Sequence, residues 1–351
     1  MQNIDVHLLQ PREYPHLLSI VAPMYNEESV VPHLRAALTR FLGELQGEAE
    51  VVLVNDGSKD GTLAEIVAWA YEDRRVKVIN LSRNFGHQLA ATAGLDFAAG
   101  DAVVLIDADL QDPLSVVHQM IARYREGYDV VYGRRVSRAG ESIFKRLSAW
   151  LFYRTMRSLV YKDMPTDTGD FRLLSRHCLE GLHQMRETHR FLRGMVAWVG
   201  YPQIGVEYER AARVAGDTKY PLRKMLSFAW TAATSFSALP LQASVWLGVI
   251  ATLLGIEEAM RATLAHLLHW YAVPGWSSLT VLVSLLGGAT LMSIGIVGEY
   301  VGKIYEQSKG RPLYLVGGTI NVDHLRGASP DHLDSVNGSA REYQEGSRQR
   351  T

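Results

Sequence analysis

The sequence is poor in cysteine and has almost no excess of charge of either sign. Its only cysteine among 351 residues is Cys178, so no disulfide can form within the chain and a reducing compartment is expected. The net charge of −1 gives no electrostatic basis for binding nucleic acid. Residues 1–15 lack the apolar core of a secretory signal peptide. These absences argue against a disulfide-stabilised secreted domain and against a nucleic-acid-binding protein.

Long apolar runs occur only in the second half of the chain. Residues 238–256 and 272–298 contain no Asp, Glu, Lys or Arg, and each run is long enough as a helix to cross about 30 Å of hydrocarbon. They predict a transmembrane hairpin over 238–302, with spans at about 238–260 and 275–300. A buried core helix is the alternative for the first run, which ends at Glu257 and Glu258.

Basic residues flank the predicted hairpin unevenly. Only one, Arg261, lies between the two runs, whereas several precede the first run and follow the second: Arg210, Arg213, Lys219, Arg223, Lys224, Lys303, Lys309 and Arg311. The positive-inside rule then places both ends of the hairpin in the cytoplasm. The chain is therefore expected to be a multi-pass protein of the cytoplasmic membrane. Small residues at four-residue spacing in the hairpin also allow association of copies into a homo-oligomer.

The first 220 residues alternate short apolar runs with segments of helical character. Strands are expected at 17–22, 50–56, 75–81, 101–107 and 129–133, and helices at about 28–45, 61–72, 86–99 and 113–126. Such alternation predicts an α/β fold with a mostly parallel sheet covered by helices on both faces. Ligands of such sheets bind beyond the carboxyl ends of the strands, so the residues that follow the strands are the candidates for a site.

Acidic segments follow three of the expected strands: PMYNEE (23–28), NDGSKDGT (55–62) and DADLQDP (107–113). Asp107 and Asp109 are two positions apart and point the same way in an extended segment. With the side-chain carbonyl of Gln111 they can hold a hard divalent cation such as Mg²⁺ or Mn²⁺. Two alternatives remain: the D-x-D pattern arises by chance, and Asp112 with Pro113 also suits the start of a helix.

Five motifs in this order resemble the inverting family 2 glycosyltransferases: VAPMYNEE, VNDGSKDGT, LSRNFGHQLAATAGLDFAAGD, DADLQDP and DTGDFRLLSR. The polyprenyl-phosphate branch of that family is the most similar, and it includes bactoprenol glucosyltransferases and dolichol-phosphate mannosyltransferases. The resemblance covers about 17–220 and, through GEYVGKIYEQSKGRPLYLV, extends to about 320. It implies a GT-A-type fold, a nucleotide-sugar donor, a divalent metal and a lipid-phosphate acceptor at the cytoplasmic membrane face.

The resemblance also implies roles for matching residues. Asp170 matches the proposed catalytic carboxylate, and the alternative is a buried structural carboxylate paired with Arg172. Asp107 would serve both the ribose and the metal, together with Asp109 and Gln111. The residues expected to hold the nucleoside are Pro23, Tyr25, Glu27 and Asp56. For Glu27 and Asp56, turn and helix-cap chemistry is the alternative.

Basic residues supply candidates for binding phosphate groups. Arg213 and Lys219 resemble a segment that closes over the diphosphate of the donor, and general membrane-surface charge is the alternative. Arg134, Arg146 and Ser148 are the candidates for the lipid-phosphate site, since guanidinium groups bind phosphate in a bidentate manner. Attraction to anionic lipid explains the same residues equally well. His87 reads as a loop histidine and is not assigned a role.

The expected layout is an N-terminal extension (1–16), a cytoplasmic GT-A catalytic domain (17–220), a juxtamembrane helix (221–237), the transmembrane hairpin (238–302), a cytoplasmic return segment (303–321) and a disordered tail (322–351). The expected reaction moves a hexose, glucose from UDP-glucose, to undecaprenyl phosphate. GDP-mannose and other UDP-sugars are alternative donors, because motif spacing does not define the hydroxyl contacts that select a sugar.

Two other classes of function fit less well. A polymer-forming synthase would need more membrane helices and a Q-x-x-R-W motif, which the chain lacks. A non-catalytic binding protein would be free to lose Asp107, Asp109 or Asp170, and all three are present. A two-helix hairpin does not easily move a glycolipid across a membrane, so a flippase and a downstream glycosyltransferase are expected partners.

Overall fold

The computed structural model describes residues 9–135, 168–209, 239–268 and 276–322. These belong to two compact units, one made of 1–148, 163–219 and 312–351 and the other of 149–162 and 220–311. The predicted juxtamembrane helix and nearly all of the predicted tail lie outside the described residues.

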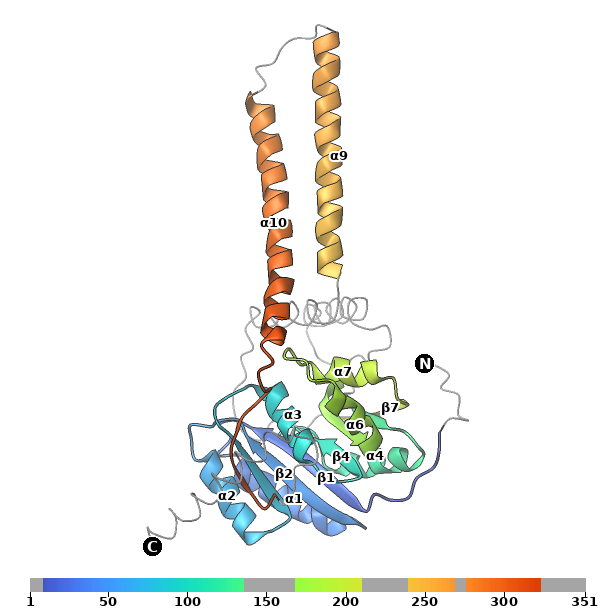
Figure 1. The fold of residues 1–351 in the computed structure, drawn as a ribbon. Coiled ribbons are helices and arrows are strands. Elements are labelled where there is room, and N and C mark those ends of the chain that lie inside the picture. Colours follow the sequence, from blue (N-terminus) through green and yellow to red (C-terminus); the bar gives the residue numbers. More distant parts are fainter. Residues whose placement is uncertain (1–8, 136–167, 210–238, 269–275, 323–351) are drawn as a thin grey trace. The chain divides into compact units, whose positions relative to one another are not determined.

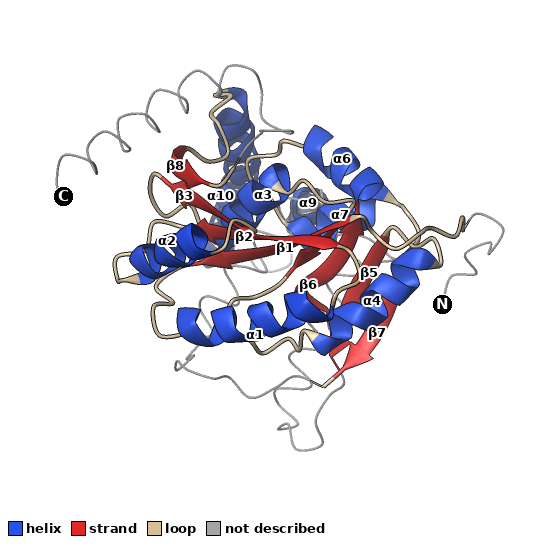
Figure 2. Cartoon of the chain, turned by 90° about the horizontal axis from the view of Figure 1, so that it is seen from below, coloured by secondary structure: helices blue, strands red, loops and turns tan. Residues whose placement is uncertain are grey.

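The first unit is built on an eight-stranded sheet with the strand order β7-β5-β6-β4-β1-β2-β3-β8 (Figures 1 and 2). Neighbouring strands are parallel across β4-β1-β2-β3 and between β5 and β7, whereas β6 is antiparallel to both of its neighbours and β8 is antiparallel to β3. The strands are β1 (Leu17–Met24), β2 (Glu48–Asn55), β3 (Val76–Leu81), β4 (Ala102–Leu105), β5 (Val130–Arg135), β6 (Thr168–Ser175), β7 (Gln203–Tyr208) and β8 (Val316–Ile320).

Helices cover both faces of this sheet, as Figure 2 shows with α1 and α4 on one side and α3 and α6 on the other. The described helices of this unit are α1 (Val31–Glu44), α2 (Thr62–Glu72), α3 (His87–Phe97), α4 (Ser115–Arg125), α6 (Arg176–Gln184) and α7 (Leu192–Val199). The central strands are apolar along most of their length because both faces are buried. The α/β prediction and its mostly parallel sheet are confirmed.

All five predicted strands and four predicted helices form, with ends shifted by a few residues. Helix α2 begins at Thr62, and Asp60 Oδ1 accepts a hydrogen bond from the Thr62 backbone amide at 3.1 Å. The strands β6, β7 and β8 and the helices α6 and α7 were not among the predicted elements. Of these, β6 matters most, because it completes the site described below.

Helix α3 approaches the sheet closely at Gly94. A Cβ atom at this position would lie 2.3 Å from Val21 Cγ1 of β1 and 3.0 Å from Val54 Cγ2 of β2. Both valines are fully buried. The absence of a side chain at Gly94 therefore sets the distance between α3 and the sheet.

The segment after the long C-terminal helix returns to this sheet. β8 pairs with the outer edge of β3, and the Ser82 amide donates to the Leu315 carbonyl at 2.9 Å. Close by, the Tyr314 hydroxyl donates to Asp96 Oδ2 of α3 at 2.7 Å, and Asp96 also pairs with Arg186 at 2.8 Å. Residues 312–322 thus belong structurally to the first unit, although they follow the apolar runs in sequence.

The second unit contains two long helices, α9 (Leu239–Leu267) and α10 (Trp276–Ser308), which lie side by side (Figure 1). The Ser293 hydroxyl of α10 donates to the Ser244 carbonyl of α9 at 3.5 Å. Among the described residues, one segment is long and apolar enough to cross a membrane, the 24 residues Leu285–Ser308. The apolar part of α9, Leu241–Glu257, is shorter. The two-span hairpin therefore stays a prediction.

Candidate active site

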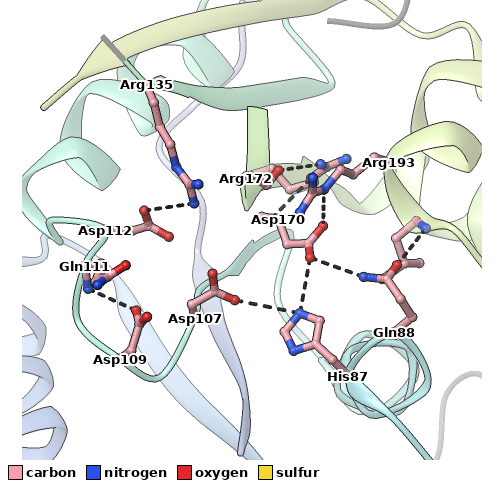
Figure 3. Close-up of polar contacts among 12 residues, drawn as sticks. His87, Gln88, Asp107, Asp109, Gln111, Asp112, Arg135, Asp170, Arg172 and Arg193 are labelled. Atoms are coloured by element: carbon pink, nitrogen blue, oxygen red, sulfur yellow. Dashed lines mark hydrogen bonds and ion pairs between the residues drawn. The ribbon is translucent and has the colours of Figure 1, made fainter. Parts of the chain in front are cut away.

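Several of the predicted site residues lie at the edge of the sheet where β1, β2 and β4 end, among them Asp56, Asp107 and Asp109. β6 runs antiparallel to β4 with Arg172 opposite Leu105. Two residues beyond that pair, Asp107 follows β4 and Asp170 lies in the first half of β6. The register of one antiparallel pair therefore brings together two carboxylates that are 63 positions apart in sequence, as Figure 3 shows.

Asp56, at the end of β2, orients the turn that leads into α3. Its carboxylate is 2% exposed, and its two oxygens accept from the Phe85 amide at 2.7 Å and the Gly86 amide at 2.9 Å. Gly86 has φ of 97°, a conformation that L side chains rarely adopt. This turn places His87, the first residue of α3, at the same edge of the sheet.

The imidazole of His87 lies between the two carboxylates. Its Nε2 is 3.2 Å from Asp170 Oδ2 and 3.7 Å from Asp107 Oδ1, and the side chain is 44% exposed (Figure 3). Burial lowers the pKa of His87, but the hydrogen bond and charge of Asp170, together with Asp107, outweigh burial and raise the pKa above its ordinary value. The two carboxylates thus favour the protonated form of His87.

Two further side chains hold the Asp170 carboxylate. Arg193 Nε of α7 donates to Oδ1 at 2.8 Å, and Gln88 Nε2 donates to Oδ2 at 3.2 Å. Burial raises the pKa of Asp170, but the charge of Arg193 and the hydrogen bonds from His87 and Arg193 outweigh it and hold the pKa well below its ordinary value. Such a carboxylate is a poor proton acceptor near neutral pH.

Arg172 does not pair with the Asp170 carboxylate, which was the alternative considered for this residue. Its guanidinium donates instead to the backbone carbonyls of Gly169 at 2.9 Å and Asp170 at 3.3 Å. Arg172 is 4% exposed, and burial lowers its pKa to about 10. The positive charge of Arg172 still favours the ionised form of Asp170, although Arg172 does not pair with the carboxylate. Arg193 contacts the carboxylate directly.

The loop after β4 turns sharply between its acidic residues. Leu110 has φ of 55°, and Asp109 Oδ1 accepts a hydrogen bond from the backbone amide of Gln111 at 3.1 Å across that turn. Gln111 is 8% exposed, and its side-chain oxygen has no hydrogen-bond partner among the described residues. Burial raises the pKa of Asp107, and the neighbouring carboxylates Asp170, Asp112 and Asp109 raise it further. This loop therefore concentrates negative charge beside a buried, unpaired carbonyl oxygen.

Comparison with known proteins identifies the family. The model of glycosyl transferase family 2 matches residues 19–182. An uncharacterized glycosyltransferase of Synechocystis is 44% identical over 308 residues, covering 88% of this chain and 97% of that protein. The chain belongs to the family 2 glycosyltransferases.

This glycosyltransferase is also similar to one further sequence and to one solved structure. The prophage bactoprenol glucosyl transferase homolog of Escherichia coli is 37% identical over 299 residues, which cover 85% of this chain and 98% of that protein. Among solved structures, glucosyl-3-phosphoglycerate synthase of Mycobacterium tuberculosis in complex with UDP aligns with a TM-score of 0.42 and 20% identity, covering 63% of this chain and 79% of that one.

The acidic loop of the glycosyltransferase fits a divalent cation that shares its coordination shell with a ligand. Asp107 and Asp109 supply carboxylate oxygens, and the Gln111 carbonyl oxygen is buried without a partner in the described part of the chain. Among the described residues, no three His, Cys, Asp or Glu side chains converge to hold a metal by themselves. Mg²⁺ typically takes one or two carboxylates and completes its shell with phosphate and water, so this donor set suits it.

The residues predicted to hold the nucleoside lie past β1 and β2. Pro23 is buried in β1, whereas Tyr25 beyond the strand is 42% exposed. The Glu27 amide donates to Thr62 Oγ1 at 2.8 Å, which ties this loop to the start of α2. Together with Asp56 these residues line neighbouring strand ends, and their role in binding the nucleoside remains a prediction.

The predicted phosphate-binding residues are only partly described. Arg134, at the end of β5, is exposed and lies 3.6 Å from Glu207. The next residue, Arg135, points the other way and donates to the Tyr208 hydroxyl at 3.2 Å, with Asp112 Oδ1 at 3.8 Å. Four other predicted residues lie outside the described part of the chain: Arg146, Ser148, Arg213 and Lys219.

Sequence reasoning missed three residues around Asp170, namely His87, Gln88 and Arg193. A signal for the first two was available, because NFGHQ follows the third predicted strand and so belongs at the same edge as the acidic segments. Arg193 carried no comparable signal, since α7 was not predicted and its contact with Asp170 depends on how α7 packs.

Proposed function

We propose that this glycosyltransferase moves glucose from UDP-glucose to undecaprenyl phosphate and so makes a polyprenyl-phosphate sugar. The observation that carries the proposal is the nearly full-length similarity to a protein named as a bactoprenol glucosyl transferase homolog, 98% of which is covered at 37% identity. The arrangement around Asp170 supports it, because a carboxylate held in its ionised form suits an acceptor that needs no deprotonation.

The proposed reaction forms one bond and breaks one. An oxygen of the acceptor phosphate attacks C1 of the sugar, the bond from C1 to the diphosphate breaks, and the configuration at C1 inverts. The acceptor is already anionic because the second pKa of a phosphate monoester is about 6. Asp170 then stabilises positive charge that develops on the sugar ring, or orients the acceptor, and does not remove a proton.

The donor side of the proposed site uses the ends of β1, β2 and β4. Pro23, Tyr25, Glu27 and Asp56 would hold the nucleoside, and Asp107 would lie beside the ribose. Asp107, Asp109 and Gln111 would hold Mg²⁺ or Mn²⁺. When bound, that ion offsets the negative charge that builds on the departing diphosphate. Arg213 and Lys219 would close over the same diphosphate.

The acceptor side would be built on Arg134, Arg146 and Ser148, at the membrane face of the catalytic domain. We propose that α9 and α10 anchor this domain as a hairpin with both ends in the cytoplasm. Exposed apolar side chains on α10, such as Leu291 and Ile294, are suited to contact with lipid. Because a hairpin alone does not carry the product across the membrane, a flippase and a second glycosyltransferase would act after this enzyme.

The test is transfer of radiolabel from a panel of nucleotide sugars to undecaprenyl phosphate by the purified protein, with and without EDTA. The proposal expects label in the lipid from UDP-glucose alone, and none after EDTA. Label from GDP-mannose in its place would favour a mannosyltransferase like those that act on dolichol phosphate. Absence of transfer from every donor, with binding of UDP intact, would refute the proposed acceptor.

A further inference from the structure

His87 makes two contacts that no other described side chain of the site combines. A single ring nitrogen, Nε2, faces Asp170 Oδ2 at 3.2 Å and Asp107 Oδ1 at 3.7 Å. Asp170 has other partners in Arg193 and Gln88, whereas His87 is the one ion-pair partner of Asp107 in the described part of the chain. The link between the two carboxylates therefore runs through one imidazole.

We infer that His87 is a positioning residue that fixes the distance between Asp107 and Asp170. The assignment of Asp107 to the donor and Asp170 to the acceptor rests on the proposed function. Two carboxylates at one edge repel each other, and the ring of His87 lies between them with one nitrogen 3.2 Å from Asp170 and 3.7 Å from Asp107, which holds them at one spacing. Because the attack on C1 needs donor and acceptor aligned to within fractions of an ångström, that spacing matters for the reaction rate.

The backbone around His87 is built to hold the ring in this place. The Asp56 carboxylate binds the two amides just before it, and Gln88 Oε1 accepts from the Leu192 amide at 2.9 Å, which ties the start of α3 to the start of α7. The ring itself contacts the residue after β4 and a residue of β6, while the end of β2 holds the turn that precedes it. These contacts restrict movement of the His87 ring.

The test compares two neutral amides at position 87. A glutamine amide nitrogen reaches about as far as Nε2 of histidine, whereas an asparagine amide nitrogen is too short. We expect His87→Asn and His87→Ala to lower kcat about 10- to 100-fold, the range for loss of a hydrogen bond to a charged group, with KM for the donor changed by less than about 3-fold. His87→Gln should retain several-fold more activity than His87→Asn.

Chemical rescue gives a second readout that a merely structural role would not move. Because the ring is 44% exposed, free imidazole should reach the space left in His87→Ala and restore part of kcat. The matched control is His118 of α4, an exposed histidine with a single carboxylate partner, Glu44, at 3.4 Å. His118→Ala and His118→Asn should retain wild-type kcat and show no response to imidazole.

Several results would overturn the inference. Equal kcat for His87→Asn and His87→Gln would do so, as would a loss confined to KM, which would make His87 a substrate-binding group. Failure of the wild-type enzyme to use undecaprenyl phosphate would instead refute the proposed acceptor. In that case we compare the rates at which the same variants hydrolyse UDP-glucose. Rates that fall in the order wild type, His87→Gln, His87→Asn support the positioning role, and equal rates refute it.

Discussion

Replacing Gly94 with alanine tests how closely α3 must approach the sheet. The new Cβ would lie 2.3 Å from Val21 Cγ1, whereas carbon atoms pack at about 3.5–4.0 Å. Val21 is completely buried and belongs to β1, so it has no free space to enter. Overpacking of this kind costs up to about 3 kcal/mol, and the better helix propensity of alanine returns about 1 kcal/mol. We therefore expect a net loss of about 2 kcal/mol in the free energy of unfolding.

Thermal unfolding of the full-length protein in detergent measures this loss. About 2 kcal/mol corresponds to a Tm lower by about 4–8 °C for a unit of this size. Gly43 of α1 is the matched control, because a Cβ there meets nothing within 4 Å. Gly43→Ala should leave Tm unchanged or raise it. If Gly94→Ala melts at or above the wild-type temperature, the close approach of α3 does not constrain the fold as argued.

Three further predictions concern individual side chains. Asp109→Asn is expected to abolish metal-dependent transfer without lowering Tm, and normal transfer at limiting Mn²⁺ would contradict its role as a ligand. Tyr314→Phe removes the hydroxyl that donates to buried Asp96, so the free energy of unfolding should fall by about 1–3 kcal/mol in denaturant titrations; an unchanged midpoint would contradict this. Because the pKa of Asp170 is depressed in the folded state, its stabilisation is complete above its unfolded pKa of about 3.9 and is lost as the pH falls below that value. The wild-type Tm should therefore fall more steeply than that of Asp170→Asn as the pH falls below about 4, and parallel curves would refute the argument.

Much of the fold could be predicted because its central strands are continuous apolar runs. β1 and β2 are buried over most of their length, so their sequences indicate where the strands lie, and their carboxyl ends mark the site. The residues after β2 and β4 include Asp56, Asp107 and Asp109. This part of the prediction depends only on local pattern and on the general rule for parallel sheets.

The rest of the site depends on register and packing, which local pattern does not contain. The sequence of β6 does not reveal that this strand runs antiparallel to β4, so the meeting of Asp107 and Asp170 could not be derived from spacing. Arg172 is near Asp170 in sequence and suggested a pair, but its guanidinium binds backbone carbonyls. The actual partner, Arg193, comes from a helix whose position is set by packing.

The pairing of β8 with β3 has a consequence for the order of folding. β8 follows β7 by more than 100 residues, and both long helices lie between the two strands. During synthesis from the N-terminus, the outer edge of β3 stays unpaired until residues 316–320 emerge, after α9 and α10 have been made. An unpaired edge strand is prone to pair with other chains. A shortened protein that ends before α9 would carry this exposed edge permanently, so a soluble version of the catalytic unit needs residues 312–322 joined back to it.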